Sequence, residues 1–263
     1  MKIGLISSGM ETLALFHFLT RYNHEYVIYF DSLNAPYWDK HFSTSLENVK
    51  KGIKYLKSLW VEKIIIPPVY ELTLQEEASI LPLFSNYLMR EVFPHSLVWK
   101  LGLLGEFADL EMAQNLIEEF SKKYTPSLEQ KSVKRFSYPF HYWAKEVWIL
   151  NPLLTRLSWK SLLTNTLIKQ ELRYFKDANV DTVIPLNYLY FNAEKTISKF
   201  FNFKKIRFHR LDKLEKIFTE LVKNEEDNYT ISIHATDQTS FLKREKRMIW
   251  LLQRGKTIEI QRL

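Results

Sequence analysis

Residues that can bind a small ligand or move a proton follow four short apolar runs of the sequence. They occupy residues 7–9, 67–71, 105–109 and 187–190. Serine and glycine at 7–9 let the chain turn sharply after a strand. Ligands of parallel α/β proteins bind at the carboxyl ends of strands. We therefore expect these four segments to line one binding site.

The apolar runs themselves repeat along the chain. Residues 2–8 read KIGLISS and residues 100–106 read KLGLLGE, and a helical pattern follows each. Residues 63–71 (KIIIPPVYE) and 181–190 (DTVIPLNYLY) are both strand-like runs that end at a proline, with a tyrosine after it. The repeat predicts an α/β fold of two similar lobes, each a mainly parallel sheet flanked by helices, with the cleft between them. The predicted lobes are 1–95 plus 210–263, and 96–209.

The spacing of apolar residues and the prolines place the remaining elements. They predict strands at 25–30, 64–66, 134–138, 182–184, 206–209 and 229–234. They predict helices at 42–59, at 73–93 with a bend at Pro82, and at 110–124, 158–179, 193–201 and 239–251. Residues 140–148 are predicted as an aromatic loop or short helix. Asp212 is predicted to cap a helix at 213–224.

Composition excludes several classes of site. The 263 residues contain no cysteine, which excludes disulfides, thiolate catalysis and cysteine-based metal sites. The seven histidines show no metal-ligand spacing, so we expect no metal.

The formal charge of +7 suits a small acidic ligand. We interpret the basic clusters at 204–210 and 243–247 as helix faces or strand edges and not as nucleic-acid contacts. With no signal peptide and no apolar run of about 20 residues, we expect a cytoplasmic protein without a membrane segment.

Several segments match motifs of one known family. Residues 30–38 (FDSLNAPYW) are similar to the motif Phe-Gly-Asp-Thr-Ala-Asn-Val-Pro-Tyr-Gly with one residue deleted. Residues 7–9 stand where the family has Asp-Ser-Gly, and residues 236–237 stand near its Thr-Gly-Asp. Tyr138 and Pro139 precede Glu146 as a Cys-Pro pair precedes a glutamate of the family. Over nearly its whole length the sequence resembles the aspartate/glutamate racemase superfamily, glutamate racemase most closely.

The resemblance implies a reaction that needs no cofactor. In the family, two cysteines face each other across the α-carbon of an amino acid, and one removes the proton that the other returns. Here Pro68 and Asn187 stand at the two cysteine positions, while Ser7 and Leu189 replace the aspartate and the histidine that support them. Inversion needs a base on one face and an acid on the other. Proline has no titratable side chain and asparagine is a poor base, so this pair cannot run the two-base reaction.

The resemblance also indicates which residues would form a site. Glu71, Tyr70 and Glu146 are the candidate substitutes for the missing acid/base groups. Glu71 is either a buried base or a cap of a helix that starts near Thr73. Asp31 and Glu146 either orient a ligand or are hydrogen-bonded carboxylates at strand ends. The candidate ligand-binding residues are Ser7, Ser8, Gly9, Asp31, Asn34, Pro36, Tyr37, Val69 and Tyr188.

Three functions follow from these residues. The first is a non-catalytic racemase homologue with a binding or regulatory role. Its partners would be a small acidic ligand such as an amino acid, a second copy of the chain, or another protein, because some family members bind DNA gyrase. The second is an active superfamily enzyme, an isomerase, lyase or hydrolase on a small acid, with a rebuilt site. The third is a structural protein whose cleft is filled by aromatic side chains.

Overall fold

The computed structural model describes residues 1–9, 11–96, 100–105, 107–129, 140–147, 150–155, 161–202, 206–222, 229–239 and 258–262. The chain divides into two compact units. The first is Met1–Leu83 with Glu215–Leu263, and the second is Phe84–Leu214. The predicted lobe limits at 95/96 and 209/210 stay a prediction.

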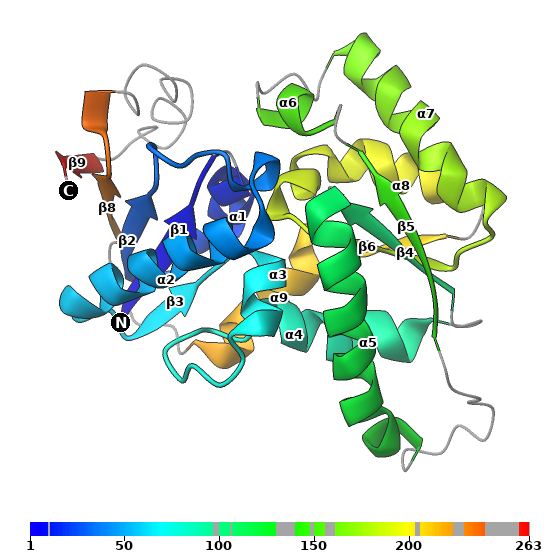
Figure 1. The fold of residues 1–263 in the computed structure, drawn as a ribbon, viewed down its shortest axis with the longest axis horizontal. Coiled ribbons are helices and arrows are strands. Elements are labelled where there is room, and N and C mark those ends of the chain that lie inside the picture. Colours follow the sequence, from blue (N-terminus) through cyan, green and yellow to red (C-terminus); the bar gives the residue numbers. More distant parts are fainter. Residues whose placement is uncertain are drawn as a thin grey trace. The chain divides into compact units, whose positions relative to one another are not determined.

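The first unit is built on a five-stranded sheet in the order β3-β1-β2-β8-β9, and every pairing is parallel. In Figure 1, α2 crosses one face of this sheet, where it contacts β1 and β2. The strands are β1 (Lys2–Ser7), β2 (Glu25–Phe30), β3 (Lys63–Ile65), β8 (Thr230–Ala235) and β9 (Ile258–Arg262). The helices are α1 (Glu11–Leu19), η1 (Tyr37–Asp39), α2 (Phe42–Ser58), α3 (Pro68–Thr73) and the end of α9 (Leu211–Leu221).

The second unit is built on a four-stranded parallel sheet in the order β5-β4-β6-β7. Helix α5 contacts β4 and β5, and α8 contacts β7. The strands are β4 (Lys100–Gly105), β5 (His141–Glu146), β6 (Thr182–Pro185) and β7 (Arg207–Phe208). The helices are α4 (Leu83–Tyr87), the π-helical turn η2 (Leu88–Val92), η3 (Phe93–His95), α5 (Phe107–Glu129), α6 (Leu150–Thr155), α7 (Leu162–Asp177), η4 (Tyr188–Ala193) and α8 (Glu194–Asn202).

The two sheets share a core of three strands. In each, the first strand of the unit (β1 or β4) lies between the second (β2 or β5) and the third (β3 or β6). The fourth strand is added on opposite sides, because β8 pairs with β2 whereas β7 pairs with β6. The central strands β1 and β4 are buried along nearly their whole length, as expected for parallel strands covered by helices. The predicted fold class of two similar α/β lobes is confirmed.

Three local predictions are wrong. Residues 73–93 do not form one bent helix, because α3 ends at Thr73 and α4 begins only at Leu83. The aromatic stretch at 140–148 contains strand β5 instead of a loop or helix. Asp212 lies inside the first turn of α9, and the backbone amide of Leu211 donates instead to Glu194 Oε2 at 2.7 Å. The predicted strand at 134–138 and almost all of the predicted helix at 239–251 lie outside the described residues.

Among the helices that the structure describes, none combines the length and the apolar character needed to cross a membrane.

Candidate functional site

Most of the candidate residues of the first unit lie where its strands end. Ser7 closes β1, Asp31 directly follows β2, and Thr236 directly follows β8. The three positions are tied together through the backbone. The amide of Asp31 donates to Ser7 O at 3.0 Å, and the amide of Thr236 donates to Phe30 O at 3.1 Å. Parallel pairing therefore gathers these side chains at the edge where α/β proteins bind their ligands.

The carboxylate of Asp31 is the centre of this edge. Asp31 is 1% exposed, and its oxygens accept hydrogen bonds from three other residues. Asn34 donates its backbone amide to Oδ1 and its carboxamide to both oxygens, each at 3.1 Å. The Tyr37 hydroxyl donates to Oδ2 at 3.0 Å, and the Thr236 hydroxyl donates to Oδ1 at 3.2 Å. Asp31 thus organises the loop after β2, as a hydrogen-bonded carboxylate at a strand end does.

Tyr37 joins this loop to the loop after β1. Its backbone amide donates to Ser8 Oγ at 3.1 Å, and its carbonyl accepts from Ser45 Oγ at 3.1 Å. Burial raises the pKa of the Tyr37 hydroxyl, and the adjacent charge of Asp31 raises it further. The hydroxyl therefore stays protonated and acts as a donor. Pro36, which precedes Tyr37, follows a cis peptide bond.

The loop after β1 is closed by Glu11, which was not among the site residues predicted from the sequence. Glu11 Oε1 accepts from the Ser8 amide at 2.8 Å and from Ser8 Oγ at 3.2 Å. Ser7 Oγ donates to Gly9 O at 2.8 Å. Burial raises the pKa of the Glu11 carboxyl, although the hydrogen bonds from Ser8 oppose this. The spacing Ser8-x-x-Glu11 is that of a capping box, and this signal was present in the sequence.

The segment that the resemblance aligned with the first cysteine forms the short helix α3. Pro68 is its first residue, a place where proline is favoured because its missing N–H would have no helical partner. Glu71 is 1% exposed and lies in the first turn of α3. The predicted cap on a helix that starts near Thr73 is therefore wrong, since Thr73 is where α3 ends. Val69 is buried in the same helix.

Tyr70 is packed in an aromatic cluster with Tyr37 and Phe42. Its ring stacks on Phe42 at 5.3 Å between centroids, and it meets Tyr37 edge-on at 6.3 Å. Tyr70 is 4% exposed. The structure thus brings Tyr70 beside the network of Ser8, Asp31 and Tyr37.

In the second unit, the segment that the resemblance aligned with the second cysteine begins the short helix η4. Asn187 precedes it, and its Oδ1 accepts from the Leu189 amide at 2.8 Å. Tyr188 and Leu189 are buried at 2% and 0% exposure. Asn187 therefore caps η4 through its side chain.

Glu146 lies at the end of β5, opposite Gly105 of β4, and is exposed. The site residues predicted from the sequence thus belong to two different units: Ser7–Tyr37 and Pro68–Glu71 to the first, and Glu146, Asn187 and Tyr188 to the second. In the described part of the chain, no three acidic or histidine side chains are grouped so that they would hold a metal ion.

Comparison with known proteins identifies the fold. No protein-family model matches the chain. No curated protein matches its sequence significantly. Among solved structures, several glutamate racemases match the fold of this chain from end to end.

Three glutamate racemase structures illustrate the match. The enzyme from Francisella tularensis in complex with D-glutamate has a TM-score of 0.73 at 16% identity, over 98% of this chain and 96% of that one. The enzyme from Thermus thermophilus in complex with beta-chloro-D-alanine has a TM-score of 0.72 at 16% identity, over 100% and 96%. The Escherichia coli enzyme in complex with L-glutamate and the activator UDP-MurNAc-ala has a TM-score of 0.66 at 13% identity, over 100% and 97%. At these identities the likeness is one of fold.

Proposed function

We propose that this chain is a glutamate racemase homologue that does not perform two-cysteine racemisation and has a binding or regulatory role. One observation carries the proposal. The chain has no cysteine, and the residues at the two cysteine positions have structural tasks instead, since Pro68 begins α3 and Asn187 caps η4. Removing an α-proton and returning it on the other face needs a base and an acid, and neither residue supplies one.

The loops of the first unit support the non-catalytic part of the proposal. Four of their residues already use donors within the protein, because Ser8 donates to Glu11 while Asn34, Tyr37 and Thr236 donate to Asp31. A small acidic ligand remains the proposed class. Two of the similar structures are complexes with D-glutamate and L-glutamate, and the formal charge of +7 favours an acid.

The test is α-proton exchange in deuterium oxide. The protein is incubated with L- and D-glutamate and with both aspartates, and the α-proton signal is followed by NMR beside a no-protein sample and an active glutamate racemase. We expect no exchange above the no-protein sample over a day. Exchange or inversion would overturn the non-catalytic proposal. A thermal-shift screen with the same four acids then tests binding.

A second candidate, an active enzyme with a rebuilt site, rests on the burial of Glu71. This carboxyl is 1% exposed, beside Tyr70 in α3, and a buried carboxyl can acquire a raised pKa and act as a base. The same exchange experiment decides this case. If exchange is seen and Glu71 is the base, Glu71→Gln should abolish the exchange and Glu146→Gln should leave it unchanged. If Glu146 is the base, Glu146→Gln should abolish the exchange and Glu71→Gln should leave it unchanged.

A further inference from the structure

Asn151 is a fully buried carboxamide in the second unit. It is the second residue of α6 and is 0% exposed. Among the described residues, no hydrogen-bond partner faces its Nδ2 or its Oδ1. Native proteins leave few buried polar groups unsatisfied, because such a group loses its hydrogen bonds to water and gains nothing in return. A leucine would fill the same volume without that loss, so the asparagine calls for a reason other than packing.

Asn192 presents the same feature on the helix that α6 contacts. It lies in η4, and both polar atoms of its carboxamide are enclosed without a hydrogen-bond partner among the described residues. Helices α6 and η4 contact each other. Helix α6 follows β5 and η4 follows β6, and these strands flank β4. The two carboxamides are therefore carried at the carboxyl-terminal edge of this sheet, where α/β proteins bind ligands.

Three other polar side chains of the second unit are satisfied within the protein. Asn187 caps η4 by accepting from the Leu189 amide at 2.8 Å. Asn165 in α7 accepts from the Thr196 hydroxyl at 2.8 Å. Ser161 caps α7 by accepting from the Thr164 amide at 3.0 Å. Single buried atoms elsewhere, Thr182 Oγ1, Ser198 Oγ and Asn48 Nδ2, also lack a partner among the described residues. Asn151 and Asn192 differ from them because both polar atoms of each buried carboxamide lack one.

Two carboxamides have a defined recognition chemistry. Each offers an NH₂ group with two donors and a carbonyl oxygen that accepts. The donors suit a carboxylate and the carbonyls suit an ammonium group, so the pair matches a molecule that carries both. The head group of a free α-amino acid is such a molecule.

We propose that Asn151 and Asn192 form a ligand-binding site of the second unit that holds the carboxylate and ammonium groups of a free α-amino acid. The inference rests on the proposed function, because it names the residues that bind the acidic ligand proposed there. It differs from the sequence-based assignment, which placed most of the binding residues on the loops of the first unit.

The experiment compares Asn151→Leu with Asn165→Leu by thermal unfolding and by calorimetric titration. The probes are L-glutamate, D-glutamate, L-aspartate and D-aspartate. Asn151→Leu should unfold without ligand at the temperature of the wild type or above it, and its affinity for the acid that the wild type binds should fall about tenfold to hundredfold, the loss of a hydrogen bond to a charged group. Asn165→Leu should unfold at a lower temperature and keep its affinity within about twofold, because its carboxamide serves α8 and not the ligand.

Each other outcome overturns a defined statement. If the wild type binds none of the four acids, both the proposed ligand class and this site are wrong. If the wild type binds and Asn151→Leu binds equally well, this inference alone is wrong. If Asn151→Leu loses as much stability as Asn165→Leu, Asn151 is engaged within the protein and the inference is again wrong. If Asn151→Leu does not fold, Asn192→Leu is tested against the same expectations.

Discussion

Trp60 and Asn179 occupy equivalent places in the two units. Each directly follows the C-cap residue of a helix, α2 or α7, and each has a left-handed backbone, with φ of 59° and 53°. The amides of Trp60 and Asn179 donate to Lys57 O and Lys176 O, and the amides of the next residues donate to Leu56 O and Phe175 O. This is the Schellman ending of a helix. Each ending leads into the third strand of its unit, β3 or β6.

The glycines under these helix endings are equivalent as well. A Cβ atom on Gly4 of β1 would lie 2.8 Å from Leu56 Cδ1, and one on Gly102 of β4 would lie 2.6 Å from Phe175 Cδ1. Leu56 and Phe175 hold the same place in the two Schellman motifs. The glycine that KIGLISS and KLGLLGE share therefore allows a helix end to approach the central strand closely.

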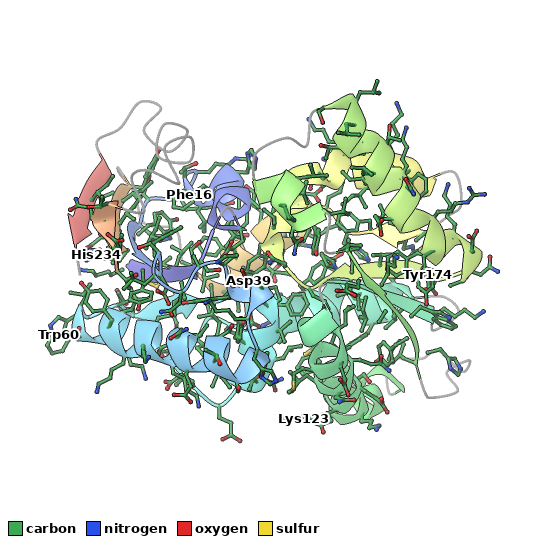
Figure 2. The ribbon with its side chains drawn as sticks, turned by 45° about the horizontal axis from the view of Figure 1, so that its top comes forward. Phe16, Asp39, Trp60, Lys123, Tyr174 and His234 are labelled. Atoms are coloured by element: carbon green, nitrogen blue, oxygen red, sulfur yellow. The ribbon has the colours of Figure 1, made fainter. Side chains whose placement is uncertain are left out.

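Replacing Trp60 by glycine should stabilise the protein. A left-handed conformation costs an ordinary residue about 1–2 kcal/mol, and the greater freedom of unfolded glycine offsets about 0.5–1 kcal/mol of the gain. Trp60 is 88% exposed and projects away from the end of α2 (Figure 2), so little packing is lost. Urea unfolding should show a gain of about 0.5–1 kcal/mol. Asn179→Gly is the control and should gain less, because asparagine tolerates this conformation.

Removing the Tyr37 hydroxyl should destabilise the first unit. Tyr37→Phe takes one donor from the buried Asp31 carboxylate, and hydrogen bonds to charged groups contribute about 1.5–3 kcal/mol. Tyr26→Phe is the matched control, because its buried hydroxyl donates to the neutral Leu19 carbonyl at 2.7 Å. For Tyr26→Phe, denaturant unfolding should show a free energy of unfolding lowered by about 1 kcal/mol, the usual value for a hydrogen bond between neutral groups. If the two variants lose equal free energy of unfolding, the hydrogen bond from Tyr37 to Asp31 is no stronger than one between neutral groups.

Asn187 should behave as a helix cap. Asn187→Ala should lower the free energy of unfolding by about 1 kcal/mol, the typical loss of an N-cap side chain. Asn187→Asp should retain most of the stability of the wild type, because a carboxylate oxygen can accept from the Leu189 amide in the same way. If alanine and aspartate are equally destabilising in equilibrium unfolding, the side chain does not act as a cap.

The Glu11 carboxyl should make stability depend on pH. Its pKa is raised above 4.5 by burial in the folded protein, so the folded state binds the proton more tightly than the unfolded state. Its contribution is therefore fully present below about pH 4.5 and is lost as pH rises through the folded pKa. Glu11→Gln keeps an oxygen for Ser8 and carries no charge, so it should exceed the wild type in thermal stability at neutral pH and lose this advantage in acid.

Glu77→Gln is the control for that measurement. A hydrogen bond from Lys57 lowers the pKa of Glu77, so its contribution is present above the unfolded pKa and is lost as pH falls through the folded pKa. The two variants should therefore change the pH profile of thermal unfolding in opposite directions. If the thermal stability of Glu11→Gln and of the wild type changes with pH in parallel, the prediction that burial raises the pKa of the Glu11 carboxyl is wrong.

The fold was predictable where local pattern and tertiary environment agree. The runs at 2–7, 25–30 and 182–185 are apolar enough to be buried strands, and the repeat of KIGLISS and KLGLLGE marks the two central strands. The prediction failed at 140–148, where alternating aromatic and polar residues do not distinguish an edge strand from a loop. It also failed at 73–93, because apolar spacing does not show that α3 starts at a proline and stops five residues later.

The sequence by itself determined the absence of any thiol, the two-lobed α/β class and the positions of Pro68 and Asn187. Only the tertiary structure decided what the polar side chains do, because hydrogen bonding depends on which loops parallel pairing brings together. It joins Asp31 to Thr236 across 205 positions of sequence, so that a candidate ligand-binding carboxylate becomes the centre of a loop network. It also encloses Asn151, which no motif marked, because burial is a property of packed helices and not of a residue's neighbours in the chain.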